Sequence, residues 1–229
     1  MDDFFARSEA LLGEKTMEAL RHRRVIIFGV GGVGSYAAEA LIRTGLTHLT
    51  IVDGDTVQPS NINRQLPATR ATMGMPKVEA LKARLLEINP DAEIEALPVM
   101  ANGEWLEANG LPYDYVIDAI DSVNDKVDLI IYATRARVKI FSSMGAALRF
   151  DPTQVTTGEL MAIKGDALAK AVRARMKKLD VHPYRKVKCV YSTEQAQRCE
   201  TRGSLMQVTA VFGLTLASMV IENIQRITQ

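Results

Sequence analysis

The chain has 229 residues, a hydrophobic content of 47% and a formal net charge of +1 at pH 7. This length and hydrophobic content suffice for one domain with a sizeable core and exclude a disordered chain, and the near-neutral charge excludes nucleic-acid binding through overall charge alone. Two cysteines are too few for a disulfide scaffold or for paired C-x-x-C zinc ligands, so we expect a cytoplasmic protein.

Hydrophobic periodicity predicts alternating strands and helices up to residue 145. Two short helices are expected in residues 1–20, where apolar residues are spaced among charged ones. The predicted elements that follow are a strand at 25–28, a helix at 33–44, a strand at 49–52, a helix at 77–88, strands at 94–99 and 115–118, a helix at 123–137 and a strand at 139–143. Because strands and helices alternate, we expect an α/β fold with a Rossmann-like, doubly wound and mainly parallel sheet.

The pattern changes after Gly145. The later segments are a weakly alternating stretch at 147–159, a basic helix at 167–179, a short strand at 187–191, a loop at 192–203 and a last helix. We therefore expect residues 1–229 to form a single domain. Its two parts are a βαβ core with N-terminal helices at 1–145 and a C-terminal α+β extension at 146–229 that recognises a substrate or partner.

Two features of the extension bear on its partners. The apolar run 205–221 carries polar residues and falls short of the roughly 20 apolar residues that a membrane span needs, so we expect a buried helix and no membrane contact. Residues 170–188 hold eight cations against the single acid Asp180. This segment is a candidate contact for a polyanion, and the alternative is an ordinary solvated helix face.

A glycine motif follows the first predicted strand. Its glycines are Gly29, Gly31, Gly32 and Gly34, and about twenty residues later the second strand ends at Asp53. Glycines let the backbone turn tightly and approach phosphates at a helix N-terminus, and the acid can accept hydrogen bonds from ribose hydroxyls. The motif predicts a nucleotide-binding βαβ unit, although a turn-forming aspartate beside Gly54 is an alternative for Asp53.

A polar cluster in the next loop favours a triphosphate over a dinucleotide. The cluster consists of Ser60, Asn61, Asn63, Arg64 and Gln65. Arginine makes forked contacts with phosphate oxygens, and asparagine amides can hold sugar, phosphate or substrate atoms. The alternative is an Asn-rich turn with a solvated arginine.

Three further residues are candidates for phosphate chemistry. Lys77 begins a predicted helix, where its charge and the helix dipole can both face an anion. Asp121 and Ser122 follow a predicted strand at the edge where open α/β sheets bind ligands. Asp121 could hold Mg²⁺ against phosphates, and Ser122 could contact the nucleotide. Solvation of the lysine and simple helix capping by the other two are the alternatives.

Together these motifs resemble those of the ubiquitin-activating-type adenylyltransferases. The matching positions are Gly29, Gly31, Gly32, Gly34, Asp53, Asp55, Asn61, Asn63, Arg64, Gln65, Lys77, Asp118 and Asp121. The resemblance implies that residues 1–145 bind ATP, with Gly32, Asp53, Asn61, Arg64 and Lys77 as contacts and Asp121 beside the metal. It further implies that Arg7 reaches into a neighbouring subunit's ATP site, and hence a homodimer.

Within this family the chain is most similar to the dehydratases that act on threonylcarbamoyladenosine in tRNA. The similarity lies in residues 7–9, 12–14, 116–122, 151–154, 190–194 and 208–213. It implies activation of the nucleoside's carboxylate by ATP and closure to a cyclic form. It also implies tRNA as a partner and suggests a cysteine desulfurase system as a candidate partner.

The cysteines mark a departure from those dehydratases. Only residues 195–203 lie between the Ser-Thr-Glu segment and the last helix, and Cys199 is the nearest counterpart of a cysteine that the dehydratases carry near the end of a longer stretch. Cys199 is a candidate nucleophile or a plain loop thiol, whose pKa Arg198 and Arg202 would lower. Cys189 is expected in a strand, and none of the three histidines is assigned chemistry.

Three rival functions remain open from the sequence. The first is an adenylyltransferase that activates the C-terminal glycine of a ubiquitin-like sulfur-carrier protein; the absence of C-x-x-C pairs counts against it. The second is an NAD-dependent oxidoreductase, which the glycine motif alone would allow. The third is a nucleotide-binding scaffold without catalysis, which the short 195–203 loop favours.

Overall fold

The computed structural model describes residues 4–197, 200–201 and 203–229. The helices are α1 (Ala6–Leu12), α2 (Glu14–Arg21), α3 (Gly34–Thr44), α4 (Lys77–Ile88), α5 (Gly103–Asn109), α6 (Val123–Arg135), α7 (Ala167–Leu179) and α8 (Met206–Thr228), with short 3₁₀ turns η1 (Pro59–Asn61), η2 (Arg70–Thr72) and η3 (Pro152–Gln154). The strands are β1 (Arg24–Phe28), β2 (His48–Val52), β3 (Glu93–Leu97), β4 (Tyr115–Asp118), β5 (Lys139–Ser143), β6 (Val155–Glu159) and β7 (Lys188–Ser192).

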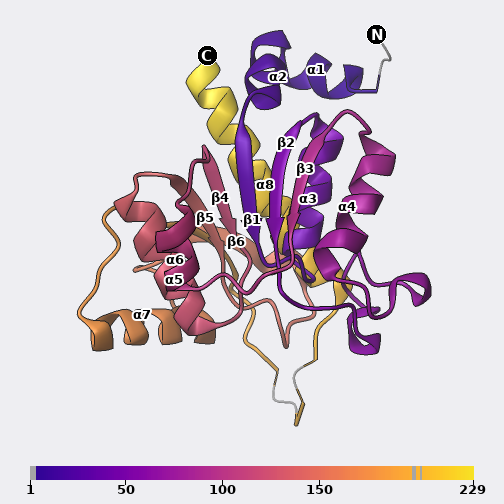
Figure 1. Cartoon of the computed structure of the whole chain (residues 1–229). Coiled ribbons are helices and arrows are strands. Elements are labelled where there is room, and N and C mark those ends of the chain that lie inside the picture. Colours follow the sequence, from indigo (N-terminus) through magenta and orange to yellow (C-terminus); the bar gives the residue numbers. More distant parts are fainter. Residues whose placement is uncertain (1–3, 198–199, 202) are drawn as a thin grey trace.

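All seven strands belong to one sheet with the order β3-β2-β1-β4-β5-β7-β6. Every neighbouring pair is parallel except β6 with β7. The sheet is flanked by helices on both faces (Figure 1). The expected Rossmann-like, doubly wound and mainly parallel α/β fold is therefore confirmed. The strand order reverses between β1 and β4, and open α/β sheets bind their ligands at such a point.

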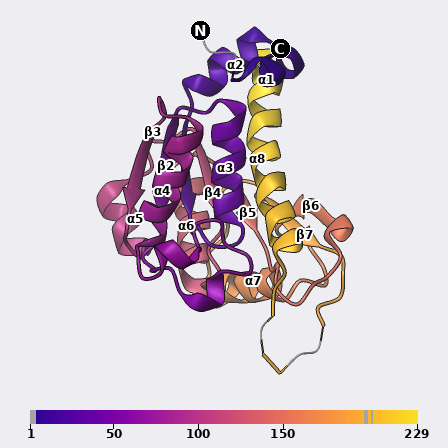
Figure 2. The same cartoon turned by 90° about the vertical axis from the view of Figure 1, so that its right-hand side faces the viewer.

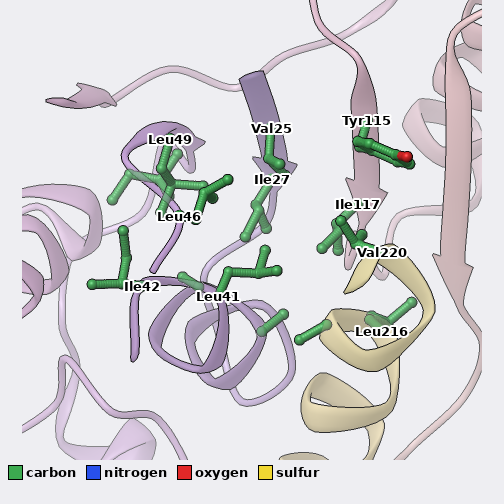
Figure 3. Close-up of a cluster of buried hydrophobic side chains, with 14 of the residues drawn as sticks. Val25, Ile27, Leu41, Ile42, Leu46, Leu49, Tyr115, Ile117, Leu216 and Val220 are labelled. Atoms are coloured by element: carbon green, nitrogen blue, oxygen red, sulfur yellow. The ribbon is translucent and has the colours of Figure 1, made fainter. Parts of the chain in front are cut away.

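One face of the sheet packs against α2, α3, α4 and α8. Val25 and Ile27 of β1 and Ile117 of β4 point toward Leu41 of α3 and Leu216 of α8, as Figure 3 shows, and all five side chains are buried. Alternate residues of β1 face this layer because side chains of a strand alternate between its two faces. This larger hydrophobic cluster fixes the start of α3 against the carboxyl end of β1.

The opposite face packs against α5, α6 and α7. Phe28 of β1 lies edge-on to Trp105 of α5, with ring centroids 5.9 Å apart, and Ile130 of α6 and Val172 of α7 are fully buried in the same cluster. Burial on both faces explains why the central strands read as continuous apolar runs rather than as alternating ones.

The last helix, α8, runs alongside α3 and ends beside the N-terminal helices (Figure 2). It is the one helix in the described part of the chain that is long and apolar enough to cross a membrane, yet 56% of its most apolar window is buried inside the protein. A β-carbon on Gly213 would overlap the carbonyl oxygen of Val33, so α8 touches the beginning of α3 through backbone. The expectation of a buried helix is confirmed.

Most predicted elements are confirmed with shifts of one or two residues at their ends, and α4 and α7 have the predicted bounds. Helix α5 was not predicted, because seven residues are too few for a periodic pattern. Its signal was local, since the side chain of Asn102 accepts a hydrogen bond of 2.9 Å from the backbone N–H of Trp105 and caps the helix. The extension contributes β6 and β7 to the same sheet, where β7 pairs with β5.

Candidate active site

A cavity of about 620 Å³ opens at the carboxyl ends of the central strands. Its walls include the turns that follow β1, β2, β4 and β5, together with the N-terminal end of α7. Of the predicted site residues, those lining it are Gly29, Gly31, Gly32, Asp53, Asp55, Arg64, Gln65, Lys77, Asp121 and Ser122. The structure thus brings most of the sequence-predicted residues to one cavity at the switch point of the sheet.

The glycine turn brings backbone close to backbone. Gly29 has φ of +83°, and a β-carbon there would lie 2.8 Å from the carbonyl oxygen of Ala119. A β-carbon at Gly34 would overlap the carbonyl oxygen of Gly29, so the turn closes only with glycine at both positions. Helix α3 begins at Gly34 and has free backbone N–H groups at its N-terminus, which suits a phosphate in the cavity.

Asp53 and Lys77 meet at the next wall of the cavity. The Asp53 carboxylate accepts hydrogen bonds of 2.9 Å from the backbone N–H groups of Val30 and Asp55, which ties the end of β2 to the glycine turn. The Lys77 ammonium lies 4.0 Å from Asp53 Oδ1 and 2.6 Å from Asp55 Oδ2, and its side chain is 8% exposed. A nearly buried cation thus stands between two carboxylates on the cavity wall.

The polar cluster of the following loop divides between scaffold and cavity. Asn61 Oδ1 accepts a hydrogen bond of 2.9 Å from the N–H of Gln58, and Asn63 Nδ2 donates one of 2.8 Å to the carbonyl of Ser204. Neither asparagine lines the cavity. Their nucleotide contacts stay a prediction.

Arg64 and Gln65 do face the cavity. Arg64 Nη1 donates to the Ser60 carbonyl at 2.9 Å and to Asn63 Oδ1 at 2.8 Å, which holds the guanidinium beside the glycine turn. Gln65 is 8% exposed, and its Oε1 atom is buried without a hydrogen-bond partner among the described residues. A buried amide oxygen that lacks a partner costs free energy, which fits a residue that binds a ligand group.

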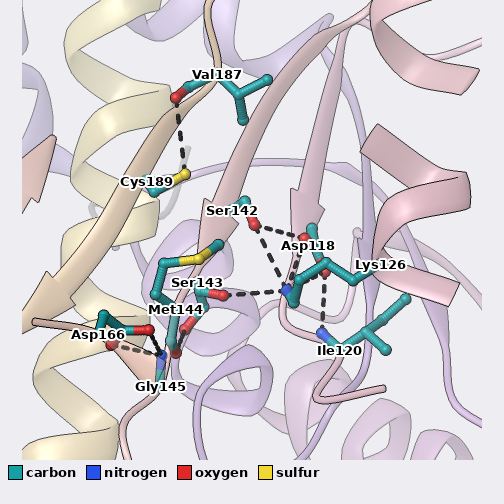
Figure 4. A network of polar contacts seen from close by, with 10 residues as sticks. All are labelled: Asp118, Ile120, Lys126, Ser142, Ser143, Met144, Gly145, Asp166, Val187 and Cys189. Carbon is teal, nitrogen blue, oxygen red and sulfur yellow. Dashed lines mark hydrogen bonds and ion pairs between the residues drawn. The ribbon is translucent and has the colours of Figure 1, made fainter. Parts of the chain in front are cut away.

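A fully buried ion pair lies beneath the turn after β4 (Figure 4). The Lys126 ammonium lies 2.7 Å from Asp118 Oδ2 and 2.8 Å from Oδ1, and both side chains are 0% exposed. Lys126 also donates to the Ser143 carbonyl at 3.0 Å, and Ser142 Oγ donates to Asp118 at 2.5 Å. One cation therefore joins the carboxyl ends of β4 and β5. Lys126 was not among the predicted residues, although it lies on the apolar face of the predicted helix with Val127 and Ile130, where a lone lysine indicates a buried partner.

Asp121 follows Asp118 by three residues and lines the cavity. Its carboxylate is exposed and makes no hydrogen bond to any described residue, whereas the carboxylates of Asp53 and Asp55 are engaged by N–H groups and Lys77. Ser122 occupies the N-cap position of α6, although its side chain makes no capping hydrogen bond. In the described ranges no group of three His, Cys, Asp or Glu residues could hold a metal alone. Asp121 is therefore free to share a metal with phosphate oxygens, as Mg²⁺ usually requires, and Asp125 is a second lining carboxylate without a hydrogen bond to a described residue.

The far wall of the cavity comes from the extension. Arg149, 3% exposed, bonds the carbonyl of Gly145 at 3.0 Å and the carboxylate of Asp166 at 3.1 Å, and it also donates to the carbonyl of Glu194. Two backbone hydrogen bonds, from Asp151 and Phe150, lower the pKa of Glu194 below its ordinary value against a smaller opposing effect of burial. Arg149 carried no motif in the sequence and was missed for that reason.

Two predicted catalytic residues lie elsewhere. Arg7 is exposed on α1, which sits at the amino ends of the strands and thus at the opposite edge of the sheet from the cavity (Figure 1). Cys199 lies outside the described residues. Cys189 is a buried residue of β7, as expected, and burial is the main cause that raises the pKa of its thiol to about 12.

The Cys189 thiol is expected to resist alkylation at pH 8 in the folded protein. A pKa of about 12 keeps it in the unreactive protonated form, and 0% exposure denies a reagent access. Peptide mapping after brief iodoacetamide treatment should find Cys189 unmodified. The same treatment of the protein unfolded in guanidinium chloride should modify it. Equal modification with and without denaturant contradicts this expectation.

Known proteins resemble the chain over most of its length. The model of the ThiF family matches residues 5–229. The tRNA threonylcarbamoyladenosine dehydratase of Bacillus subtilis (strain 168) is 41% identical over 177 residues, which cover 76% of this chain and 69% of that protein. The crystal structure of the E. coli tRNA N6-threonylcarbamoyladenosine dehydratase in complex with ATP matches with a TM-score of 0.93 at 34% identity, over 98% of this chain and 95% of that one.

A relative from another branch matches less of the chain. The molybdopterin-synthase adenylyltransferase of E. coli (strain K12) is 37% identical over 134 residues, which cover 58% of this chain and 53% of that protein. The match to the dehydratase structure, in contrast, covers 98% of this chain and so extends over nearly all of residues 146–229. The chain belongs to the ThiF family, in the group that contains the tRNA threonylcarbamoyladenosine dehydratases.

Proposed function

We propose that this chain uses ATP to cyclise threonylcarbamoyladenosine in tRNA, with loss of one water from the nucleoside. The observation that carries the proposal is the cavity at the switch point, which gathers the glycine turn, the cations Arg64, Lys77 and Arg149, and the exposed carboxylate of Asp121. The similarity to dehydratases over nearly the whole chain supports this substrate over a carrier protein.

Each wall of the cavity has a distinct role in this proposal. The N-terminus of α3, Arg64 and Lys77 bind the phosphates, where backbone N–H groups and positive charge are already in place. Asp53 binds the ribose from the end of β2, and Gln65 supplies a polar group near the glycine turn. Arg149 and Asp166 form the wall from which the nucleoside is recognised.

The reaction needs two displacements. A carboxylate oxygen of the nucleoside attacks the α-phosphorus of ATP, the bond to the β-phosphate oxygen breaks, and pyrophosphate leaves. The resulting mixed anhydride is a good electrophile, so an atom of the neighbouring carbamoyl group attacks the carbonyl carbon, loses its proton and expels AMP. Ring closure is favoured because both groups belong to one molecule. The side chains of Arg64 and Lys77 stabilise the charge that grows on the leaving phosphates.

Magnesium fits this site as a further component. Asp121 offers an exposed carboxylate without a hydrogen-bond partner among the described residues, and Mg²⁺ is commonly bound by one or two carboxylates plus phosphate oxygens. When bound, the ion would neutralise part of the negative charge of the ATP phosphates. Asp121 would hold that ion, and the buried pair of Lys126 with Asp118, three residues earlier, fixes the end of β4 from which Asp121 follows.

The basic helix α7 is proposed as a contact for tRNA near the reacting nucleoside. Its first residues line the cavity, and Lys170, Lys177 and Lys178 are exposed along it. These charges can neutralise RNA phosphates, so binding should weaken as salt rises. We propose a cytoplasmic location, which a tRNA substrate supports, and a cysteine desulfurase partner rests on the family resemblance alone.

We also propose a homodimer in which Arg7 completes the site of the other subunit. Arg7 is exposed at the edge of the sheet opposite its own cavity, so it can contribute to catalysis only in a second copy of the chain. Arg7→Ala and Lys77→Ala chains should each be inactive alone. Mixed after separate purification and subunit exchange, they should regain activity, because one site of each mixed dimer then has both residues.

The mixing experiment can also contradict the shared site. If Arg7 acted within its own subunit, or not at all, the mixture would be no more active than its parts. A mixture of Lys77→Ala with Lys77→Arg chains serves as the matched control, because neither partner supplies an intact Lys77.

The reaction itself is tested by mass analysis of nucleosides. The chain is incubated with ATP, Mg²⁺ and tRNA bearing threonylcarbamoyladenosine, and the tRNA is then digested under mild conditions. We expect the nucleoside to lose one water only when ATP is present, with release of pyrophosphate. An unchanged nucleoside, together with pyrophosphate exchange that depends on a ubiquitin-like carrier protein, would replace this proposal with the adenylyltransferase function.

A further inference from the structure

Four cations gather at the amino ends of β5 and β7, far from the cavity. Lys139 begins β5, Lys188 begins β7, Arg226 lies in the last turn of α8, and Arg185 precedes β7 in the connection from α7. We call these four residues the distal basic cluster. The basic run 170–188 is therefore divided by the fold, since its helix lies by the cavity and its last residues join Lys139 and Arg226 at the opposite edge.

Strand register and helix packing bring the cluster together. The Lys139 ammonium lies 5.5 Å from the centre of the Phe141 ring, and Phe141 is paired in register with Lys188, so both lysines lie on the same face of the sheet. Tyr115 is paired in register with Lys139, and its hydroxyl donates a 3.0 Å hydrogen bond to Asn223 of α8. The last turn of α8, with Arg226, therefore lies beside Lys139.

Two acidic groups lie beside the cluster, and a third is paired elsewhere. Glu159 faces Lys188 in register and Glu222 precedes Arg226 by one turn of α8, whereas Asp114 pairs with Arg23 at 2.9 Å. The four cations outnumber the two nearby carboxylates. In residues 4–197, 200–201 and 203–229, no ion pair within 4.0 Å includes a member of the cluster. The cluster is left with net positive charge.

The members of the cluster repel one another. Partial burial first, and then the charges of Arg226, Lys188 and Arg185, lower the pKa of Lys139 below its ordinary value. Lys139, Lys188, Arg185 and Arg226 are all exposed to solvent. Repulsion among exposed cations is relieved by an anion that touches several of them at once, and a chain of phosphates meets that need better than one carboxylate does.

The distance between the distal basic cluster and the cavity favours a ligand that is long enough to reach both. A strand of five residues spans about 16 Å at roughly 3.3 Å per residue, so the amino and carboxyl edges of the sheet are separated by several phosphates of an RNA strand. Figure 1 shows α7 at one of these edges and the C-terminal end of α8 at the other. We propose that the distal basic cluster binds the phosphate backbone of the substrate tRNA at a distance from the reacting nucleoside. This inference rests on the proposed function.

The test compares two RNAs and two double variants. Lys139→Gln/Arg226→Gln removes two charges of the cluster, and Arg70→Gln/Lys82→Gln removes the same charge from the surface near η2 and α4. Binding is measured by fluorescence anisotropy over a range of salt concentrations, with intact tRNA and with a short hairpin that carries the same threonylcarbamoyladenosine. Steady-state kinetics with intact tRNA accompany the binding data.

We expect the cluster variant to bind intact tRNA more weakly, with a log–log salt slope smaller by about two, and to raise KM for tRNA with kcat unchanged. The control variant should match the unchanged chain, and both variants should bind the short hairpin normally. The inference is overturned if the cluster variant binds intact tRNA as the unchanged chain does, or if both variants weaken equally. Failure of the proposed function is separate, because then the unchanged chain forms no cyclised nucleoside whatever it binds.

Discussion

Replacing Lys77 with alanine is expected to lower kcat for cyclisation by roughly 10²–10³-fold, the usual effect of losing one charged group that stabilises a transition state. The Lys77 side chain is 8% exposed on the cavity wall, and its ammonium lies 2.6 Å from Asp55 Oδ2. Its removal takes away positive charge where pyrophosphate leaves and frees two nearby carboxylates to repel phosphates. Rapid-quench measurement of pyrophosphate release with intact tRNA checks the prediction.

The matched control lies on the same helix. Lys82→Ala alters a half-buried lysine of α4 that does not line the cavity, so it should leave kcat within about twofold. Lys77→Arg keeps the charge and should retain ATP binding, yet its larger head should fit poorly beside Asp53 and Asp55. If Lys77→Ala kept full kcat, the phosphates would have to lie elsewhere in the cavity.

Replacing Lys126 with methionine is expected to reduce the free energy of unfolding by about 3–5 kcal/mol, the typical cost of leaving one partner of a buried ion pair uncompensated. Both Lys126 and Asp118 are 0% exposed, and the ammonium also serves the carbonyl of Ser143. Urea denaturation followed by circular dichroism measures the change. The dependence of the unfolding free energy on urea concentration should be the same for the variant and the unchanged chain.

A second substitution separates charge from packing. In Asp118→Asn/Lys126→Met both charges are gone, so much of the lost stability should return, and the two effects should be clearly non-additive. Activity need not return with it, because the carboxyl ends of β4 and β5 would no longer be joined through a cation. If the Lys126→Met variant were as stable as the unchanged chain, the ion pair of Lys126 with Asp118 would not stabilise the fold.

The strands and most helices were predictable because their signals are local. Continuous apolar runs at 25–28 and 115–118 are typical of strands buried on both faces, and the pattern of α4 and α7 has helical spacing. Helix α5 escaped because a single capping asparagine, Asn102, determines its start. The joining of β7 to β5 could not be predicted, since pairing between strands so distant in sequence depends on packing of the whole sheet.

The site was predictable where motifs encode close backbone approach or a charge beside a turn. Gly29, Asp53, Lys77 and Asp121 were found in this way, and all four line one cavity. The side chains of Asn61 and Asn63 bond to backbone groups in the structure, because a loop needs its own N–H and carbonyl groups satisfied, and their nucleotide contacts stay a prediction. Arg149 could not be predicted from the sequence, because its hydrogen bonds to Asp166 and Glu194 join residues that are distant in the chain.

The contact between Gly213 and Val33 has a consequence for biosynthesis. The glycine turn comes early in the chain, and α8, which contacts the start of α3 through backbone, is synthesised much later. A growing chain on the ribosome thus carries its phosphate-binding turn before the helix that packs behind it. We expect nucleotide affinity to rise once α8 has emerged and packed against α3.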